Sequence, residues 1–462
     1  GVFGSTLHLV ATIILAFIIF GAFLQASGAA RIFIDLALAV AGRYRGGPAK
    51  VAIVASALFG TINGSTLANI ATTGTVTIPL MKSIGYKPSF AGAVEAVASN
   101  GGPITPPVMG ASIFLMMDFL GVSYVRLMAM AALPALLYYL GLMVMVDHRA
   151  VRDGLKGLAR EQMPPLKKAL ADSWFCLIPF AVIIFMLVFL HFSPATSAMA
   201  ATAALVLASL FKKSYRMGPR KLGAALAGAS QGLPEVGTAV AIAGILMGSF
   251  NITGVGLTIA QELVALSGGN LAVLVGLITV ACLVLGMGLS GIAVYLLAAM
   301  LLAPALVMLN VPPLAAHFFV LWIAHAALIT PPVCPAAFLG GAIAGAPLME
   351  TGWQACRLGI VVYLLPFIWV YDPALLWIGS PGHIAFAMTT AIAGVYFTSC
   401  GVSGLMLKLL RWWERLLLLI GGILLLIPGG LTDLTALAVV AVPVVRQLGG
   451  TRLVPAWLGG RR

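Results

Sequence analysis

Ile104-Thr105-Pro106-Pro107-Val108 recurs letter for letter 225 residues further along the chain, as Ile329-Thr330-Pro331-Pro332-Val333. Four more pairs have the same separation: Ser65 and Ser290, Pro79 and Pro304, Pro88 and Pro313, and Asn100 and His325. One such match would mean little in a chain of biased composition. Five features at one offset, clustered around interruptions in apolar segments, predict an internal repeat.

The composition is typical of a membrane protein. Of the 462 residues, 61% are hydrophobic and 8% are charged, whereas an ordinary soluble domain carries roughly 25% charged residues. Apolar stretches of roughly 20 residues, long enough to cross a bilayer core as a helix, recur along the chain. The 52 glycines and 26 prolines are tolerated in membrane helices. We therefore expect an all-α, polytopic protein in a lipid bilayer.

The charge pattern argues against a nucleic-acid partner, although the net charge is +13. The basic residues lie in short runs between apolar segments, which is typical of cytoplasmic loops. The five cysteines form no CxxC or Cys/His cluster, so neither a zinc site nor a disulfide framework is indicated. The sequence has no Walker or HExxH motif, which leaves an enzyme or an ATP-driven pump with little support.

Two apolar segments are each interrupted by a glycine-rich turn. The first, residues 51–81, is broken at residues 60–65, and Lys or Arg flanks both of its ends. Both ends are therefore expected in the cytoplasm, which predicts a re-entrant hairpin. The second, residues 271–308, is broken near residues 286–291 and has no Lys or Arg near its ends. Counting crossings places its ends on the opposite face, so that the two tips meet near mid-membrane.

A broken helix follows each hairpin, with interruptions at residues 100–107 and 330–332. The expected fold thus has inverted structural repeats, two re-entrant helical hairpins and two broken transmembrane helices. Broken helices leave backbone groups unpaired where no water is available, so they are tolerated only where they bind something or line a polar cavity. Half-helix N-termini suit a carboxylate, while freed carbonyls and hydroxyls suit Na⁺. The alternative is that these helices are merely kinked and packed on one another.

The chain divides into five regions on this basis. Residues 1–48 form an N-terminal scaffold helix and an amphipathic helix, and residues 49–118 form the first hairpin and broken helix, repeat 1 of a transport domain. Residues 119–270 form scaffold helices with cytoplasmic connectors, residues 271–345 the second hairpin and broken helix, and residues 346–462 C-terminal transmembrane helices and an extension. Because the chain begins with Gly1, we expect it to be processed or cropped from something longer.

The first hairpin resembles the large membrane subunit of TRAP transporters, the tripartite ATP-independent periplasmic carriers. The similar stretches are GSTLANIATTG at residues 64–74, IPLMK at 78–82 and GY at 85–86. AGAVEAVAS at residues 91–99 and PPVMGA at 106–111 resemble the TAXI branch, in which the small and large membrane subunits are commonly fused. The resemblance covers roughly residues 1–375, and the tail around residues 412–415 and 428–433 is similar too. The small four-helix subunit expected upstream is absent here, so it is either cropped or a separate chain.

This resemblance implies a multi-pass secondary transporter of the cell inner membrane. It would work by an elevator motion, powered by a Na⁺ gradient, and would not be an enzyme. An extracytoplasmic binding protein would deliver the substrate, usually a carboxylate such as a dicarboxylate, 2-oxoglutarate or glutamate. The implied partners are this binding protein and the small four-helix subunit, with Na⁺ as coupling ion and no cofactor.

Candidate site residues follow from their positions at the breaks. We expect one Na⁺ site at the first tip, made by Asn63, Gly64, Ser65, Gly102 and Thr105. A second Na⁺ site is expected from Gly288, Ser290, Ala326 and Thr330. Substrate is expected between the tips, near Asn69, Thr72, Thr73, Asn100 and His325. Several Na⁺ contacts would be backbone carbonyls, and the alternative role for the Ser and Thr residues is helix packing.

Glu95 lies in an apolar run with no basic residue within helical reach. An intramembrane carboxyl group indicates a function such as proton coupling or an ion site. The alternatives are a structural partner for a polar group on another helix and a carboxyl group that is simply protonated. For His325, beside the second break, we favour a role in a polar cavity over that of a satisfied core histidine.

Two other readings of the sequence stay open. Within transport, the chain could be a divalent-anion/Na⁺ symporter of similar hairpin architecture that needs no binding protein. Outside transport, it could be a membrane-embedded enzyme or scaffold subunit with a polar cavity. The sequence leaves open the exact substrate, the choice between Na⁺ and H⁺, and the oligomeric state.

Overall fold

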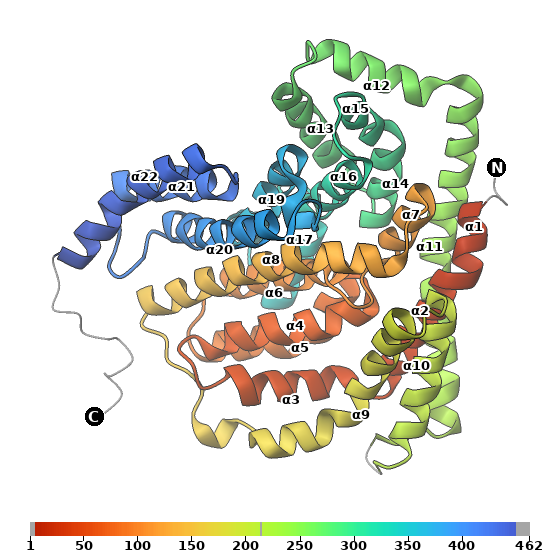
Figure 1. Ribbon diagram of the computed structural model, residues 1–462. Helices are drawn as coiled ribbons and strands as arrows, with labels where there is room; N and C mark the ends of the chain where they lie inside the picture. Colours follow the sequence, from red (N-terminus) through yellow and green to blue (C-terminus); the bar gives the residue numbers. More distant parts are fainter. Residues whose placement is uncertain (1–4, 213–214, 450–462) are drawn as a thin grey trace.

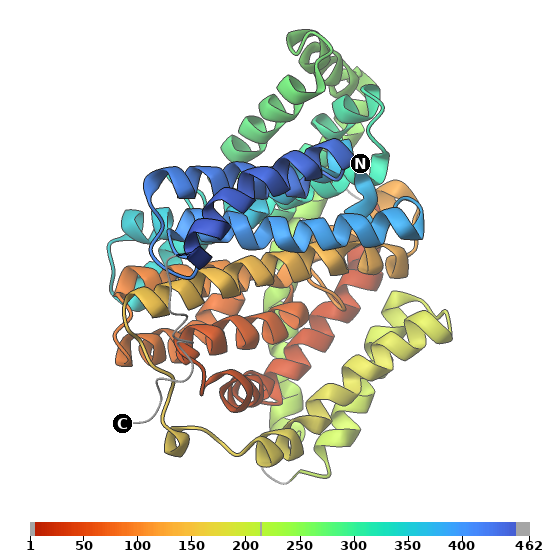
Figure 2. The same cartoon turned by 60° about the vertical axis from the view of Figure 1, so that its left-hand side comes forward.

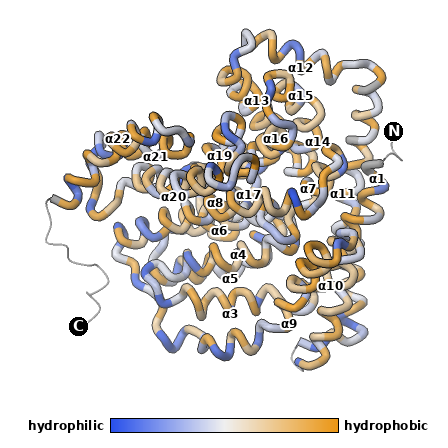
Figure 3. Tube along the Cα trace, viewed as in Figure 1, coloured by the Kyte–Doolittle hydropathy of each residue, from blue (hydrophilic) through white to orange (hydrophobic). Residues whose placement is uncertain are grey.

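The computed structural model describes residues 5–212 and 215–449, which form helices joined by short connections (Figure 1). Within these residues, seven helices are long and apolar enough to cross a membrane, or up to eight with the bent pair Leu348–Leu358 and Ile360–Tyr371. Figure 3 shows hydrophobic residues along most helices and hydrophilic residues mainly at helix ends and connectors. The expected all-α, polytopic membrane class is confirmed.

The first hairpin and the helices that follow it form one group. The hairpin consists of α4 (Gly47–Asn63) and α5 (Thr66–Ser83), which pack against each other. The interrupted helix consists of α6 (Pro88–Asn100), a 3-10 turn (Gly102–Ile104) and α7 (Ala111–Leu120), and it leads into α8 (Tyr124–Arg152). The Pro106–Pro107 pair lies between the 3-10 turn and α7, where the lack of proline N–H groups is compatible with the end of a helix.

A second group of helices has bounds close to those of the first group shifted by 225 residues. Its members are α13 (Leu271–Leu285), α14 (Gly291–Leu301), α15 (Ala303–Met308), α16 (Pro313–Ala327), α17 (Pro335–Ala344), α18 (Leu348–Leu358) and α19 (Ile360–Tyr371). Shifted by 225, α5 covers residues 291–308, the combined bounds of α14 and α15. Pro79 lies inside the continuous α5, whereas its counterpart Pro304 follows an interruption at Leu302. The helix boundaries therefore follow the sequence repeat.

The remaining helices surround these two groups. The N-terminal ones are α1 (Ser5–Leu9), a π-helical turn (Val10–Ile14), α2 (Leu15–Ala26) and α3 (Ala29–Ala41). The middle ones are a 3-10 turn (Arg160–Gln162), α9 (Leu166–Ile184), a π-helical turn (Phe185–Phe189), α10 (Pro194–Ser209), α11 (Pro219–Thr253) and α12 (Val255–Leu266). Helix α2 packs against α10 and α11, and α3 packs against α4 and α9.

The C-terminal helices form a layer on the outer side of α8 (Figure 2). A 3-10 turn (Pro373–Leu376) precedes α20 (Pro381–Ser403), which runs along α8. Helix α21 (Trp412–Leu426) packs on α20, and α22 (Gly430–Gly449) packs on α21. Helix α8 thus contacts both this layer and α4 of the first hairpin.

Each repeat contributes a half-helix to the other. Helix α17 of the second group packs against α5 and α6 of the first, and α7 of the first packs against α14 and α16 of the second. The closest approach between α6 and α17 is at Gly92 and Gly340, where a Cβ atom on Gly340 would lie 2.4 Å from the Gly92 carbonyl oxygen. Only glycine permits backbones to come this close. The two groups therefore form a single bundle.

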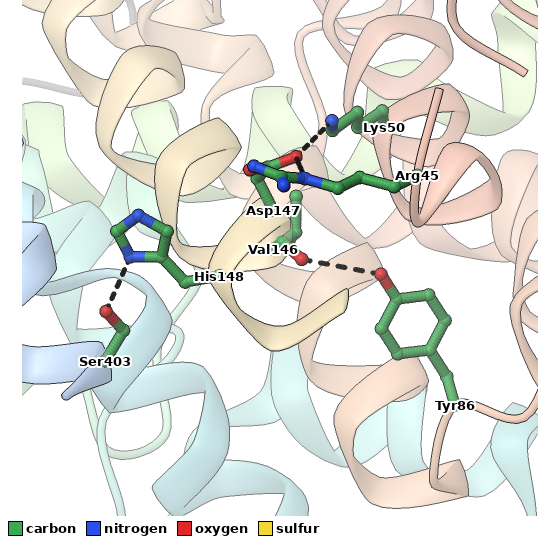
Figure 4. A network of polar contacts seen from close by, with 7 residues as sticks. All are labelled: Arg45, Lys50, Tyr86, Val146, Asp147, His148 and Ser403. Carbon is green, nitrogen blue, oxygen red and sulfur yellow. Dashed lines mark hydrogen bonds and ion pairs between the residues drawn. The ribbon is translucent and has the colours of Figure 1, made fainter. Parts of the chain in front are cut away.

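A polar network holds the C-terminal end of α8 in place (Figure 4). Asp147 pairs with Arg45, in the turn before α4, and with Lys50 of α4 at 2.5 Å. The neighbouring His148 Nδ1 lies 2.8 Å from Ser403 Oγ of α20, and the Tyr86 hydroxyl donates to the Val146 carbonyl. These contacts join the hairpin base, α8 and the C-terminal layer at one end of the bundle.

Candidate functional site

The two tips and the two helix breaks surround one cavity of about 480 Å³. Helices α2 and α11 close its remaining side, mainly with apolar and small residues. Its polar lining residues are Gln25, Asn63, Ser65, Thr66, Ser112, Ser290 and His325. No Lys, Arg, Asp or Glu lines it among the residues that the structure describes. The cavity is therefore polar at the tips but carries no formal charge from acidic or basic side chains.

The first tip is a tight turn made by Asn63, Gly64 and Ser65. Gly64 has a left-handed φ of +61°, and a Cβ atom there would lie 2.7 Å from the Met109 carbonyl oxygen. The Asn63 side-chain oxygen accepts a hydrogen bond from the Ser65 N–H at 2.7 Å. Ser65 caps α5 by accepting from the Ala68 N–H at 3.4 Å. The turn is thus held against the first helix break, next to Met109.

The second tip is more open. Helix α13 ends at Leu285, and α14 begins at Gly291 with Ser290 at its N-cap position. The Ser290 side chain makes no capping hydrogen bond, unlike its counterpart Ser65. A Cβ atom on Gly288 would meet nothing within 4 Å. The hydroxyl of Ser290 is therefore available to a bound ion or solute.

Four helix N-termini converge on the cavity. The first residues of α5, α7, α14 and α17 all line it: Thr66, Ala111, Gly291 and Pro335. A helix N-terminus carries unpaired N–H groups and a partial positive charge. Four of them around an otherwise uncharged space favour an anion.

The two breaks are joined directly by residues that match across the repeat. The Asn100 side-chain amide donates to the His325 carbonyl at 3.1 Å, and these positions are 225 residues apart. The Asn100 side-chain oxygen lies 3.4 Å from the hydroxyl of Thr66, which lines the cavity. Asn100 is fully buried behind the lining. It therefore connects the first tip with the second break.

The expected Na⁺ ligands divide between the cavity wall and the layer behind it. Asn63, Gly64, Ser65, Gly288 and Ser290 line the cavity, whereas Gly102, Thr105, Ala326 and Thr330 lie outside the lining. Gly102 packs on Gly60 of α4, so closely that a Cβ atom would lie 2.6 Å from the Gly60 Cα.

The two threonines behind the lining are engaged locally. Thr105 donates to the Gly101 carbonyl at 2.6 Å. Thr330 lies 2.6 Å both from the Ala326 carbonyl and from the Tyr363 hydroxyl. The ligand roles of all nine residues stay predictions.

The expected substrate residues are also distributed over two places. His325 lines the cavity, and Asn100 lies directly behind it. Thr72 is half-buried outside the lining, with its hydroxyl bonded to the Ala68 carbonyl at 2.8 Å. Asn69 and Thr73 are fully buried; Thr73 contacts both Asn69 and Glu95, and the Asn69 amide donates to the Ser56 carbonyl at 2.9 Å. Substrate contact thus stays a prediction for these residues.

Several lining residues are not among those predicted. Thr66 and Ser112 lie at the starts of α5 and α7, and Gln25 lies near the end of α2. Thr66 directly follows Ser65, so its place at a helix start was visible in the sequence. Gly228 and Gly232 of α11 also line the cavity, and their spacing of four residues places them on one helix face. Nothing in the sequence linked α11 to the tips.

The architecture and the cavity define a polytopic membrane protein with a solute-sized polar space between two broken-helix repeats. The chain belongs to the family described as tripartite ATP-independent periplasmic transporter, DctM component, whose model matches residues 2–384. The expected family is thereby confirmed. The TAXI branch stays a prediction from the residues quoted above.

Individual relatives agree with this assignment. The chain is 26% identical over 369 residues to the isethionate TRAP transporter permease protein DctMQ of Oleidesulfovibrio alaskensis, an alignment that covers 78% of this chain and 56% of that protein. It is 33% identical over 130 residues to the C4-dicarboxylate TRAP transporter large permease protein DctM of Pseudomonas aeruginosa, covering 28% of this chain and 30% of that one. It is 30% identical over 157 residues to the sialic acid TRAP transporter large permease protein SiaM of Vibrio cholerae, covering 33% and 36%. The chain spans about half the length of several such relatives, including 45% of a Salmonella typhimurium protein.

Proposed function

We propose that this chain is the permease of a secondary transporter that imports a small organic anion across the cell inner membrane. The observation that carries the proposal is the uncharged cavity between the two tips, with four helix N-termini at its wall. The relatives named above are described as permeases for isethionate, C4-dicarboxylates and sialic acid, all of which are anions at neutral pH. We expect a dicarboxylate, 2-oxoglutarate or a glutamate-like compound as substrate.

Charge balance supports coupling to Na⁺. An anion in this cavity meets helix N-termini but no Lys or Arg in the described lining, so its charge is only partly compensated. Bound cations would compensate the rest, and the turns at Asn63–Ser65 and Gly288–Ser290 expose carbonyl and hydroxyl oxygens of the kind that coordinate Na⁺. The anion and Na⁺ would then favour each other's binding. This is the basis of symport.

The packing is compatible with an elevator motion. The tips and the breaks belong to one bundle, α4–α8 with α13–α19, whereas α2 and α11 pack against each other beside it. The cavity lies at the boundary between the bundle and this helix pair. We propose that the bundle moves past α2 and α11 with its cargo. The extracytoplasmic binding protein and the small four-helix subunit are proposed partners, as is the TAXI-type fusion of the two membrane subunits.

Uptake into proteoliposomes tests the proposal. The complete membrane unit would be given labelled 2-oxoglutarate, glutamate or malate, with and without its binding protein, under an inward Na⁺ or proton gradient. Uptake that requires the binding protein and Na⁺ supports the proposed symporter. Uptake without the binding protein favours the stand-alone divalent-anion/Na⁺ symporter. No uptake of a broad anion panel by folded protein under any gradient would rule out the carrier.

Ser290→Ala should weaken Na⁺ activation without destabilising the fold. The Ser290 hydroxyl lines the cavity and makes no cap, so its removal takes away a ligand and no intramolecular bond. The loss of an interaction of about 1 kcal/mol corresponds to roughly a fivefold higher Na⁺ concentration for half-maximal uptake. Ser193→Ala is the control, because Ser193 is an N-cap of α10 outside the cavity lining. Equal Na⁺ activation of wild type and Ser290→Ala would remove Ser290 from the site.

A further inference from the structure

Glu95 lies behind the first tip in a shell of hydroxyl groups. Its side chain is 0% exposed, between α4, α5 and α6. One carboxyl oxygen accepts from Ser56 at 2.8 Å, Thr73 at 2.5 Å and Ser99 at 3.1 Å, and the other accepts from Thr77 at 2.5 Å. A buried carboxylate without a counter-charge is costly, and hydroxyl donors only partly compensate for it.

The ionisable groups on the elements packed against α6 are engaged elsewhere or make no bond to Glu95. Lys50 of α4 pairs with Asp147, Lys82 of α5 donates to the Ala344 carbonyl, and Glu350 of α18 accepts from Ser89. Tyr138 and Tyr139 of α8 donate to the carbonyls of Val97 and Ala98. Within residues 5–212 and 215–449, no hydrogen bond or ion pair joins Glu95 to the other ionisable residues of α8 and α18, which are Tyr124, Arg126, Asp147, His148, Arg149, Arg152, Cys356 and Arg357. Among the residues that the structure describes, no side-chain cation is therefore paired with Glu95.

The second repeat shows that the fold does not need this cluster. The counterparts of Ser56, Thr73, Thr77, Glu95 and Ser99 at the repeat offset are Ala281, Ala298, Leu302, Val320 and Ala324. Ala298, Val320 and Ala324 are fully buried within helices, Leu302 is 5% exposed at the interruption between α14 and α15, and Ala281 is half-buried. Apolar side chains thus occupy all five positions in the second group. The polar residues of the first repeat therefore lower stability without being needed for the fold, because they bury a carboxyl group. This indicates that they have a function.

A row of polar side chains leads from the cavity to Glu95. Thr66, Asn69, Thr73 and Thr77 recur every three or four residues, which places them on one face of α5. Thr66 lines the cavity, Asn69 contacts Thr73 at 3.1 Å, and Thr73 contacts Glu95. The counterpart row begins with Gly291 at the start of α14, continues with Val294 and Ala298, and ends with Leu302 just after that helix, so it is apolar.

The hydroxyl shell can follow a change in the charge of the carboxyl group. When Glu95 is ionised, all four hydroxyls can donate to it. When it is protonated, it donates to Thr73 or Thr77, whose own hydrogens can turn to helix carbonyls nearby. Thr73 Oγ1 lies 2.9 Å from the Asn69 carbonyl oxygen, and Thr77 Oγ1 lies 3.1 Å from that of Thr73. Both charge states therefore keep a complete set of hydrogen bonds.

We propose that Glu95 with Ser56, Thr73, Thr77 and Ser99 is a proton-binding site that is loaded and emptied during each transport cycle. This inference rests on the proposed function and adds a proton to the Na⁺ and anion carried. A proton fits better than a metal ion, because the oxygens contact the carboxyl group directly at 2.5–3.1 Å, the range of hydrogen bonds. A cation would have to separate these oxygens.

The test compares wild type with Glu95→Gln in proteoliposomes that contain an internal pH dye. We expect wild type to acidify the lumen when substrate enters, and a more acidic exterior to stimulate its uptake. Glu95→Gln should lose both responses but retain exchange of labelled for unlabelled substrate, which needs no net proton movement. Glu350→Gln is the matched control, since Glu350 also accepts from a serine hydroxyl but lies outside the cluster. Acidification by Glu95→Gln equal to that of wild type would overturn the proposal.

A second measurement does not depend on transport. The infrared difference spectrum between high and low pH should contain a C=O stretch of a protonated carboxyl group that wild type and Glu350→Gln share and Glu95→Gln lacks, whereas the bands of the other carboxyl groups are common to all three. The fivefold variant that takes the residues of the second repeat (S56A, T73A, T77L, E95V, S99A) should fold and also lack that band. Identical difference spectra of wild type and Glu95→Gln would refute the proton site even if no uptake is seen. If wild type shows this band and Glu95→Gln lacks it, but wild type takes up no anion, the transport function is refuted and the proton site is not.

Discussion

Gly64→Ala is expected to abolish uptake almost completely, by more than an order of magnitude. Gly64 forms the first tip with a φ of +61°, where an alanine is strained by about 1–2 kcal/mol. Its Cβ atom would also lie 2.7 Å from the Met109 carbonyl oxygen and 3.1 Å from the Gly110 Cα. Backbone atoms cannot yield as a flexible side chain would, so the tip must shift. Since about 1.4 kcal/mol is a tenfold change in affinity, loss of the Na⁺ and substrate contacts that we propose for this tip should exceed tenfold.

The chain contains a matched control for this variant. Gly121 ends α7 with the same φ of +61°, but a Cβ atom there would meet nothing within 4 Å. Gly121→Ala therefore carries the backbone strain without the clash, and it should retain most of the uptake. Initial rates of anion uptake and thermal unfolding in detergent would be measured for both variants. Equal uptake by the two variants would show that the contact with Met109 does not position the tip.

Asn100→Ala should have the second-largest effect, on both stability and transport. Asn100 is fully buried and connects the two helix breaks through the His325 carbonyl at 3.1 Å and the Thr66 hydroxyl at 3.4 Å. Removing a buried partner of two polar groups costs about 1–3 kcal/mol. The tip and the break would lose their connection, so uptake should fall further than the loss of folded protein explains. Specific uptake per folded transporter is the quantity to compare.

Asn270→Ala serves as the control for Asn100→Ala. Asn270 caps α13 by accepting from the N–H groups of Ala272 and Val273, far along the helix from the tip. Loss of such a cap lowers the free energy of unfolding by about 1 kcal/mol, which is comparable to the loss expected for Asn100→Ala. In the described part of the chain, no hydrogen bond joins Asn270 to the helix breaks. We expect specific uptake by Asn270→Ala close to that of wild type. A similar decrease in both variants would mean that Asn100 acts on stability alone.

Much of the fold could be predicted because long apolar runs indicate membrane helices, and clusters of glycine and proline within them indicate helix breaks. The offset that joins Ser65 to Ser290 also relates the bounds of α5 to those of α14 and α15. The prediction could not foresee that Pro79 leaves α5 continuous whereas Pro304 accompanies an interruption. Whether a proline breaks a helix depends on its neighbours in space, which sequence spacing does not reveal.

The sequence indicated which segments form the site, but it did not distinguish the residues that line the cavity from the residues behind that lining. Both tips and His325 do line one cavity. Asn69 and Thr73 were expected at the substrate, and the structure places both behind the cavity lining, with Thr73 bonded to Glu95 and Asn69 to the Ser56 carbonyl. Since α5 is helical, residues three and four apart share a face, but the sequence alone does not show which face meets the cavity. The contribution of α11 needed the tertiary packing.

The exchange of half-helices between the repeats has a consequence for synthesis of the chain. Helix α6 is complete once residue 100 has been made, but its partner α17 ends only at Ala344. The ribosome therefore delivers the Gly92 surface long before the Gly340 surface that covers it exists. The Gly92 face of α6 therefore stays without its packing partner α17 until the second half has been made. Neither half can reach its mature packing alone, so insertion of the second half is the step that completes the first.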